Sequence, residues 1–153
     1  MEKINDSKKI ANALQELLEK NCDAEQVYKD GLNDTEDNLL KDFILTQAKQ
    51  RTRFAKELER ELYQIDHLPA ASGTLQGTLQ RTWMDLKTIF SKNKDEIILE
   101  ECLKGEKESA EEYERSIAQY NFSEDVLRVL NGQLDEINYT LTKISSIKDL
   151  EHY

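Results

Sequence analysis

Apolar side chains recur at every third or fourth position along almost the whole chain. This spacing places them on one face of an α-helix. One proline and five glycines among 153 residues are too few for the turns of a many-stranded sandwich or barrel. The pattern therefore predicts an all-α protein with helices at 8–32, 35–66, 75–90, 95–120 and 123–147.

The lengths of the connections predict how these helices are arranged. About two residues join the first helix to the second, and about two join the last pair, so each pair is expected to form an antiparallel hairpin. Roughly thirty residues separate the hairpins, enough to travel the length of a bundle. We therefore expect one domain over residues 1–153, a ferritin-like antiparallel four-helix bundle whose long crossover contains a short extra helix.

The helix ends carry capping signals, since short polar side chains precede each apolar stripe. We expect the four main helices to be capped by Ser7, Thr35, Asp95 and Ser123. Residues 148–153 are expected to fray. A long coiled-coil rod is the competing arrangement, but the stripes do not hold a strict seven-residue repeat.

Composition restricts the environment and the partners. The net charge is −10, which disfavours binding to a phosphate backbone, so no nucleic-acid partner is expected. No stretch approaches a membrane span and no signal peptide is recognisable, so we expect a cytoplasmic protein that does not enter a membrane. The two cysteines, Cys22 and Cys102, are then expected to be reduced.

Polar residues interrupt the apolar stripes at a similar depth in all four main helices. Buried carboxylates are costly unless they are paired or bound to metal. The residues in or beside this layer are Asn21, Glu25, Gln47, Gln50, Arg51, Glu106, Gln133 and Glu136.

One interpretation of this layer is a metal centre. Ferritin-like di-iron sites use single glutamates from two helices and Glu-x-x-His pairs from the other two. Glu25, Glu106 and Glu136 are the available carboxylates for iron or manganese, but the layer contains no histidine. The ligand set is therefore incomplete, and we expect no cofactor and no catalytic residue.

The other interpretation is a buried hydrogen-bonded network. A planar guanidinium suits the bridging of carboxylates, so Arg51 is expected to pair with Glu25, Glu106 or both. Gln47, Gln133 and Asn21 would complete the hydrogen bonds. A separate candidate is an interaction surface on the predicted crossover helix, formed by Trp83, Met84 and Phe90.

Three segments resemble an uncharacterised bacterial family of ferritin-like four-helix-bundle proteins, a domain of unknown function. They are QRTRFAKEL from Gln50, SGTLQGTLQRTWMDLK from Ser72 and ILEECLKGE from Ile98. The resemblance extends over roughly residues 10–145 and implies a ferritin-like bundle without an established activity. We expect a structural, interaction or stress-associated module that binds a protein partner or a second copy of itself. The alternative is a carboxylate-based metal-binding protein or a ferritin-like oxidoreductase.

Overall fold

Four long helices and one short one make up the described part of the protein. The computed structural model describes residues 2–67, 69 and 94–153. Its elements are α1 (Ser7–Gly31), α2 (Asn38–Gln64), α4 (Lys94–Gln119), α5 (Glu124–Lys143) and the 3₁₀ helix η1 (Ile147–His152). The predicted helix at 75–90 and the candidate surface of Trp83, Met84 and Phe90 lie outside the described residues.

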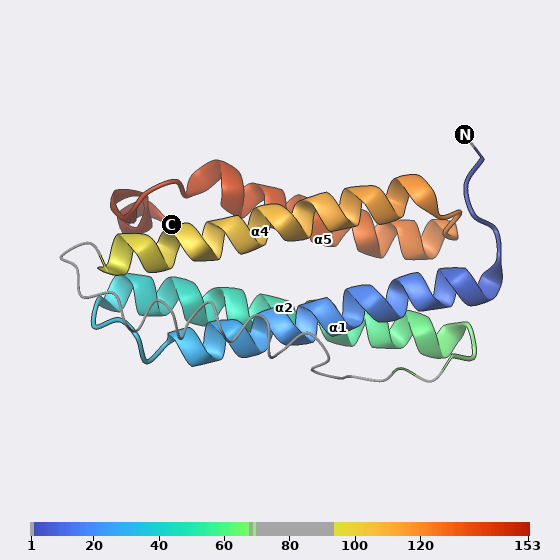
Figure 1. Cartoon of the computed structure of the whole chain (residues 1–153), viewed down its shortest axis with the longest axis horizontal. Helices are drawn as coiled ribbons and strands as arrows, with labels where there is room; N and C mark the ends of the chain where they lie inside the picture. Colours follow the sequence, from blue (N-terminus) through green and yellow to red (C-terminus); the bar gives the residue numbers. More distant parts are fainter. Residues whose placement is uncertain (1, 68, 70–93) are drawn as a thin grey trace.

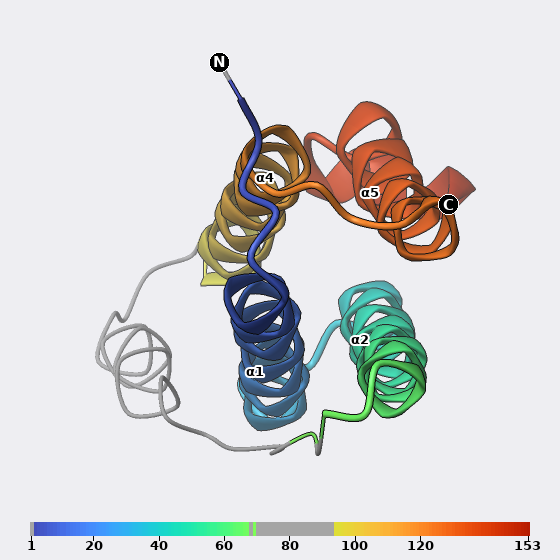
Figure 2. The same ribbon diagram turned by 90° about the vertical axis from the view of Figure 1, so that its right-hand side faces the viewer.

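The helices form two antiparallel hairpins, α1 with α2 and α4 with α5 (Figure 1). Viewed end on, α1 neighbours α4 and α2 neighbours α5, so α2 and α4 face each other across the bundle diagonal (Figure 2). The end of α2 and the start of α4 lie at opposite ends of the bundle (Figure 1). The predicted all-α bundle of two hairpins is therefore confirmed in its helices.

The helix starts differ in part from the predicted caps. Ser123 caps α5 as predicted, accepting a hydrogen bond from the N–H of Val126. Asp6 rather than Ser7 caps α1, and Asp37 rather than Thr35 caps α2, because each aspartate carboxylate reaches the free N–H groups of its first turn. The connection between α1 and α2 is consequently six residues long, 32–37, rather than two.

The displaced cap residue Thr35 has a different contact. Its hydroxyl accepts a hydrogen bond from the N–H of Asp37 and donates one to the carboxylate of Asp95 in the first turn of α4. Asp95 therefore links the α1–α2 connection to α4 instead of serving as the cap that its sequence position predicts.

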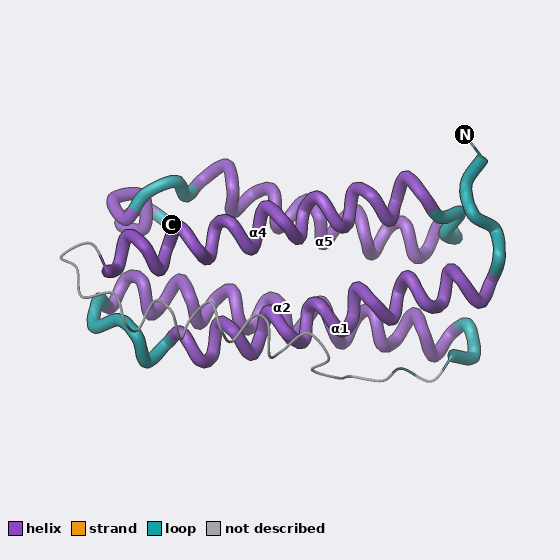
Figure 3. The backbone as a smooth tube through the Cα atoms, viewed as in Figure 1, coloured by secondary structure: helices purple, strands orange, loops and turns teal. Residues whose placement is uncertain are grey.

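The last residues of the chain do not fray, contrary to the prediction for 148–153. After α5 ends at Lys143, a loop leads to η1, which Figure 3 shows as a short helix beside the end of the bundle. The Asp149 carboxylate accepts hydrogen bonds from the N–H groups of Ser145 and Ser146, at 2.9 and 3.1 Å. Leu150 is buried in the core.

The apolar core consists of two clusters, one towards each end of the bundle. The first includes Leu14, Leu18, Phe54, Leu58, Leu130 and Ile137. The second includes Leu40, Phe43, Ile44, Ile98, Leu99 and Ile144. Arg51 on α2 and Glu106 on α4 each fall between residues of the two clusters. The polar layer therefore separates two apolar halves.

None of the helices in residues 2–67 and 94–153 combines the length and the apolar character that crossing a bilayer requires.

Candidate functional site

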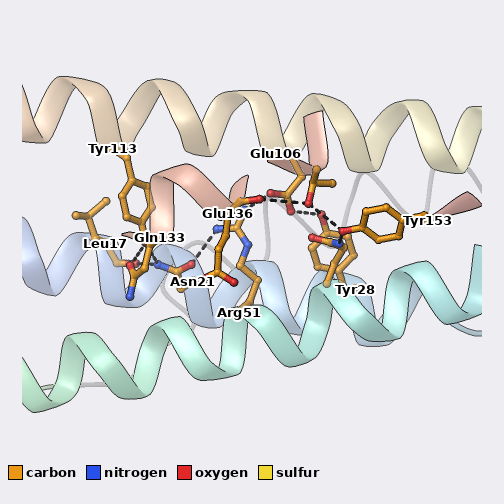
Figure 4. Close-up of polar contacts among 11 residues, drawn as sticks. Leu17, Asn21, Tyr28, Arg51, Glu106, Tyr113, Gln133, Glu136 and Tyr153 are labelled. Carbon is orange, nitrogen blue, oxygen red and sulfur yellow. Dashed lines mark hydrogen bonds and ion pairs between the residues drawn. The ribbon is translucent and has the colours of Figure 1, made fainter. Parts of the chain in front are cut away.

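The centre of the polar layer is an ion pair between Arg51 and Glu106. Arg51 Nη2 lies 2.6 Å from Glu106 Oε2, and the two side chains are 2% and 0% exposed. Because α2 and α4 lie diagonally opposite each other (Figure 2), the pair extends across the middle of the bundle (Figure 4). Taking two charges out of water is expensive, so the pair requires further hydrogen bonds to offset its desolvation.

Both ends of the ion pair receive those hydrogen bonds from α1. The hydroxyl of Tyr28 donates to Glu106 Oε1, so each oxygen of the carboxylate is engaged. Arg51 Nη1 donates to Asn21 Oδ1 at 2.9 Å. Charge-assisted hydrogen bonds of this kind are about twice as strong as neutral ones. These bonds connect four side chains at the centre of the bundle, Asn21, Tyr28, Arg51 and Glu106, and among residues 2–67, 69 and 94–153 Arg51 Nε has no hydrogen-bond partner.

A second group continues the network towards α5. Asn21 Nδ2 donates to the Leu17 carbonyl at 2.8 Å and to the Tyr113 hydroxyl at 2.9 Å. The Tyr113 hydroxyl in turn donates to Gln133 Oε1, and Gln133 Nε2 donates to the Phe54 carbonyl at 3.2 Å. The network therefore includes side chains from all four long helices (Figure 4).

A third group lies on the other side of the ion pair. Gln47 Nε2 donates to the Tyr153 hydroxyl at 3.3 Å, and that hydroxyl lies 3.2 Å from Thr140 Oγ1. Gln47 and Thr140 are completely buried, whereas Tyr153 is 45% exposed. The segment after α5 therefore supplies a partner for two buried polar side chains.

The protonation states in the layer are fixed by burial and by the ion pair. Burial raises the pKa of Tyr28 well above its ordinary value, and the neighbouring Glu106 carboxylate raises it further. Burial raises the pKa of Tyr113 to about 12. Burial alone would lower the pKa of Arg51, but the attraction of Glu106 raises it overall. At neutral pH the arginine is charged and both tyrosines are protonated.

Two of the three predicted carboxylates lie outside this group. Glu25 forms an ion pair with Lys29 one turn along α1, and its side chain is 21% exposed. Burial would raise the pKa of Glu25, but the bond from Lys29 lowers it overall. Glu136 accepts two hydrogen bonds from the exposed guanidinium of Arg53. The structure therefore brings Arg51 together with Glu106 and places Glu25 and Glu136 at the edge of the bundle.

Gln50 also lies outside the hydrogen-bonded groups. Its side-chain carbonyl oxygen is buried without a hydrogen-bond partner among residues 2–67, 69 and 94–153. Of the predicted layer, Asn21, Gln47, Arg51, Glu106 and Gln133 are buried, and Glu25 and Gln50 are partly exposed.

The residues of the layer do not fit a di-iron centre. Such a centre takes carboxylates and imidazoles from all four helices, but α2 contributes Gln47 and Arg51, and α5 contributes Gln133. Glutamine is a poor ligand for iron, and a guanidinium repels a divalent cation at close range. The described residues contain no group of three or more His, Cys, Asp or Glu side chains placed to hold a metal.

The two cysteines are free thiols in environments that disfavour the thiolate. Burial, together with the nearby Glu25 carboxylate, raises the pKa of Cys22 to about 11. Burial raises the pKa of Cys102 even more, with Glu106 one turn away adding to the effect. Because the thiolate is the nucleophile, neither cysteine is activated for attack.

The sequence interpretation missed four side chains of the network: Tyr28, Tyr113, Tyr153 and Thr140. Tyr28 and Tyr113 have the spacing of core residues, which gives no sign that their hydroxyls meet buried partners. The number of buried amide and charged groups was the available signal. Such groups need partners, and buried tyrosine hydroxyls commonly supply them.

Known proteins offer few relatives for comparison with this chain. No curated protein and no solved structure matches the chain. One family model, described as a domain of unknown function (DUF2383), matches residues 9–119. The matched region holds most of α1 and all of α2 and α4, and with them Asn21, Arg51 and Glu106. Because the match covers more than half of the chain, the protein belongs to the DUF2383 family.

Proposed function

We propose that this protein is a ferritin-like bundle in which an arginine takes the place of the metal, and that it acts as a metal-independent structural or interaction module. The ferritin-like assignment is supported by the two hairpins and by the opposite placement of the end of α2 and the start of α4 (Figure 1). A fold by itself does not determine an activity, so the function has to be argued from the polar layer.

The observation that carries the proposal is the completely buried pair of Arg51 and Glu106. The guanidinium already neutralises the carboxylate, and the Tyr28 hydroxyl binds its second oxygen. A divalent cation would have to enter beside a fixed positive charge and break both contacts. The layer is therefore suited to holding four helices in one register, a role that buried polar groups can fill.

The surface charge favours a protein partner. A net charge of −10 opposes contact with nucleic acid and with anionic lipid, both of which select basic surfaces. We propose that the module works in the cytoplasm through its helix faces, with a second copy or another protein as partner. A stress-associated role is proposed by analogy with other ferritin-like proteins.

Metal analysis tests the central part of this proposal. The chain is purified without chelator, incubated with Fe²⁺ or Mn²⁺ and desalted, and its metal content is measured by mass spectrometry. We expect much less than one metal per chain. The Glu106→Gln variant removes the buried carboxylate, and Glu108→Gln on the exposed face of α4 is the matched control.

Near-stoichiometric metal that is lost in Glu106→Gln but kept in Glu108→Gln would replace the proposal. The alternative function, a carboxylate-based metal-binding protein or oxidoreductase using Glu25, Glu106 and Glu136, would then apply. Light scattering across a concentration series tests the choice of partner, because self-association predicts a mass that rises with concentration.

A further inference from the structure

The segment that follows α5 places the Tyr153 side chain against residues of α2 and α5. A capping arrangement fixes the start of η1, since Ser146 and Asp149 exchange side-chain and backbone contacts. Leu150 is buried in the second apolar cluster. These contacts carry Tyr153 back to α2 and α5, where its hydroxyl points into the bundle (Figure 4).

We call the surface that contacts Tyr153 the notch. It consists of Phe43 and Gln47 of α2 and Thr140 of α5. The ring centroids of Tyr153 and Phe43 are 5.6 Å apart, with an edge-on interplanar angle of 62°. This is a favourable aromatic geometry. Gln47 Nε2 and Thr140 Oγ1 lie 3.3 and 3.2 Å from the Tyr153 hydroxyl. The notch therefore offers an aromatic wall and two hydrogen-bonding groups to one hydroxylated ring.

Two hydrogen-bonding groups beside an aromatic ring favour a phenol over an unsubstituted ring in the notch. Thr140 Oγ1 also lies 3.4 Å from the Glu136 carbonyl, and either oxygen of the Thr140–Tyr153 contact can be the donor. The amide of Gln47 can only donate through Nε2. A hydroxyl in the notch accepts a hydrogen bond from Gln47 and forms a second one with Thr140 in either direction, as a phenol can. An unsubstituted ring would leave both buried groups without that partner.

Tyr153 is held less firmly than the residues that it contacts. Gln47 and Thr140 are completely buried on long helices, but Tyr153 is 45% exposed and follows a short 3₁₀ helix. Gln47 Oε1 is buried with no hydrogen-bond partner among residues 2–67, 69 and 94–153, so Tyr153 does not satisfy the whole amide. A contact made by a half-exposed side chain next to a short 3₁₀ helix opens at low free energy.

We propose that the Phe43–Gln47–Thr140 notch is a binding site for small phenols, which Tyr153 occupies as an internal ligand and which a free phenol takes when Tyr153 is displaced. The site contains neither Arg51 nor Glu106. The inference therefore does not depend on whether the bundle works without metal.

Chemical complementation tests this site. The Tyr153→Ala variant empties the notch without removing a buried side chain, and p-cresol is the side-chain analogue of tyrosine. We expect p-cresol to bind Tyr153→Ala several-fold more tightly than the unsubstituted chain, in the millimolar range, and to shift the NMR signals of Thr140. Toluene, which lacks the hydroxyl, should bind about tenfold more weakly because it forms neither hydrogen bond.

Two double variants keep the test decisive. Gln47→Leu and Thr140→Val, each combined with Tyr153→Ala, remove one hydrogen-bonding group while preserving most of the side-chain volume. Either variant that folds should lose the preference for p-cresol over toluene. The inference is overturned if p-cresol and toluene bind Tyr153→Ala equally, if the double variants keep the preference, or if the unsubstituted chain binds p-cresol as tightly as Tyr153→Ala.

Discussion

Arg51 of α2 and Glu106 of α4 form an ion pair, with 2.6 Å between Nη2 and Oε2, and their helices lie diagonally opposite each other in the bundle (Figure 2). Side chains from diagonal helices meet only at the bundle axis, and two long ones are needed to span it. The pair therefore lies at the centre of the bundle, between the two apolar clusters. Its energetic role can be separated from that of ordinary surface pairs.

Replacing Arg51 alone should be severely destabilising. Arg51→Met leaves the buried Glu106 carboxylate without its counter-charge, and breaking such a pair typically costs about 3–5 kcal/mol. Arg53→Met is the matched control, because Arg53 pairs with Glu136 on the surface, where an ion pair contributes at most about 1 kcal/mol. Urea denaturation measures both free energies of unfolding. Equal losses for the two variants would show that the buried pair has no special role.

The double variant Arg51→Met, Glu106→Leu should recover most of the stability lost in Arg51→Met. Apolar side chains of similar volume remove the desolvation penalty of both charges, and such replacements are often neutral or stabilising. The same urea experiment measures the recovery. If the double variant is less stable than Arg51→Met, the carboxylate contributes through contacts other than the arginine.

The buried tyrosine hydroxyls should contribute measurably to the free energy of unfolding. Tyr28→Phe removes the donor to Glu106 Oε1, and a hydrogen bond to a charged group contributes about 1.5–3 kcal/mol. Tyr63→Phe changes the same atoms on a side chain that is 60% exposed, and we expect no measurable effect. Thermal unfolding of both variants provides the comparison. A Tyr28→Phe protein as stable as Tyr63→Phe would contradict the hydrogen-bonded network.

The helices could be predicted from the sequence because apolar spacing and helix-start residues are local properties. The polar layer was also predictable, since Asn21, Arg51, Glu106 and Gln133 each interrupt an apolar stripe. The sequence did not determine which carboxylate, Glu25 or Glu106, pairs with Arg51. Glu25 is about 40° around the helix from Asn21, enough to turn it from the core towards Lys29.

The end of the chain was mispredicted for a related reason. Residues 148–153 have no apolar stripe, which suggests fraying, but their order depends on polar contacts between Ser146 and Asp149. The spacing of a serine and an acidic residue three positions later is a local signal that indicates such a start. The contact of Tyr153 with Gln47 joins residues far apart in sequence, and no local pattern indicates it.

Alkaline pH should destabilise the bundle through Tyr113. Its pKa is raised to about 12 in the folded protein, chiefly by burial, and is about 10 in the unfolded chain. The unfolded state therefore loses its proton first, so stability is complete below pH 10 and falls as the pH rises towards 12. Absorbance measures the ionisation of tyrosine, and circular dichroism measures unfolding. Between about pH 10 and 12 the two signals should change together. In Tyr113→Phe, the part of the pH dependence that comes from Tyr113 should disappear.

Acid should release the segment that holds Tyr153. The N–H and hydroxyl of Ser145, together with those of Ser146, hold the pKa of Asp149 below its ordinary value of 3.8. The contribution of the carboxylate is therefore complete above that ordinary value and is lost as the pH falls through the lowered folded pKa. The NMR signals of Tyr153 should move to unbound positions at that point, and Asp149→Asn should weaken this docking at neutral pH. Signals that move well above pH 3.8 would contradict this assignment.

The N-terminal segment should stabilise the opposite end of the bundle through its backbone. The N–H of Ile4 donates to the Gln119 carbonyl, and the N–H of Asn121 donates to the Ile4 carbonyl, both at 2.8 Å. Ile4→Pro removes the first donor and should lower the free energy of unfolding by about 0.5–1.5 kcal/mol. Ile4→Ala keeps both backbone bonds and controls for the loss of the side chain. Hydrogen exchange of the Asn121 amide should accelerate in Ile4→Pro well beyond its rate in Ile4→Ala, and equal rates would show that the segment does not hold the α4–α5 turn.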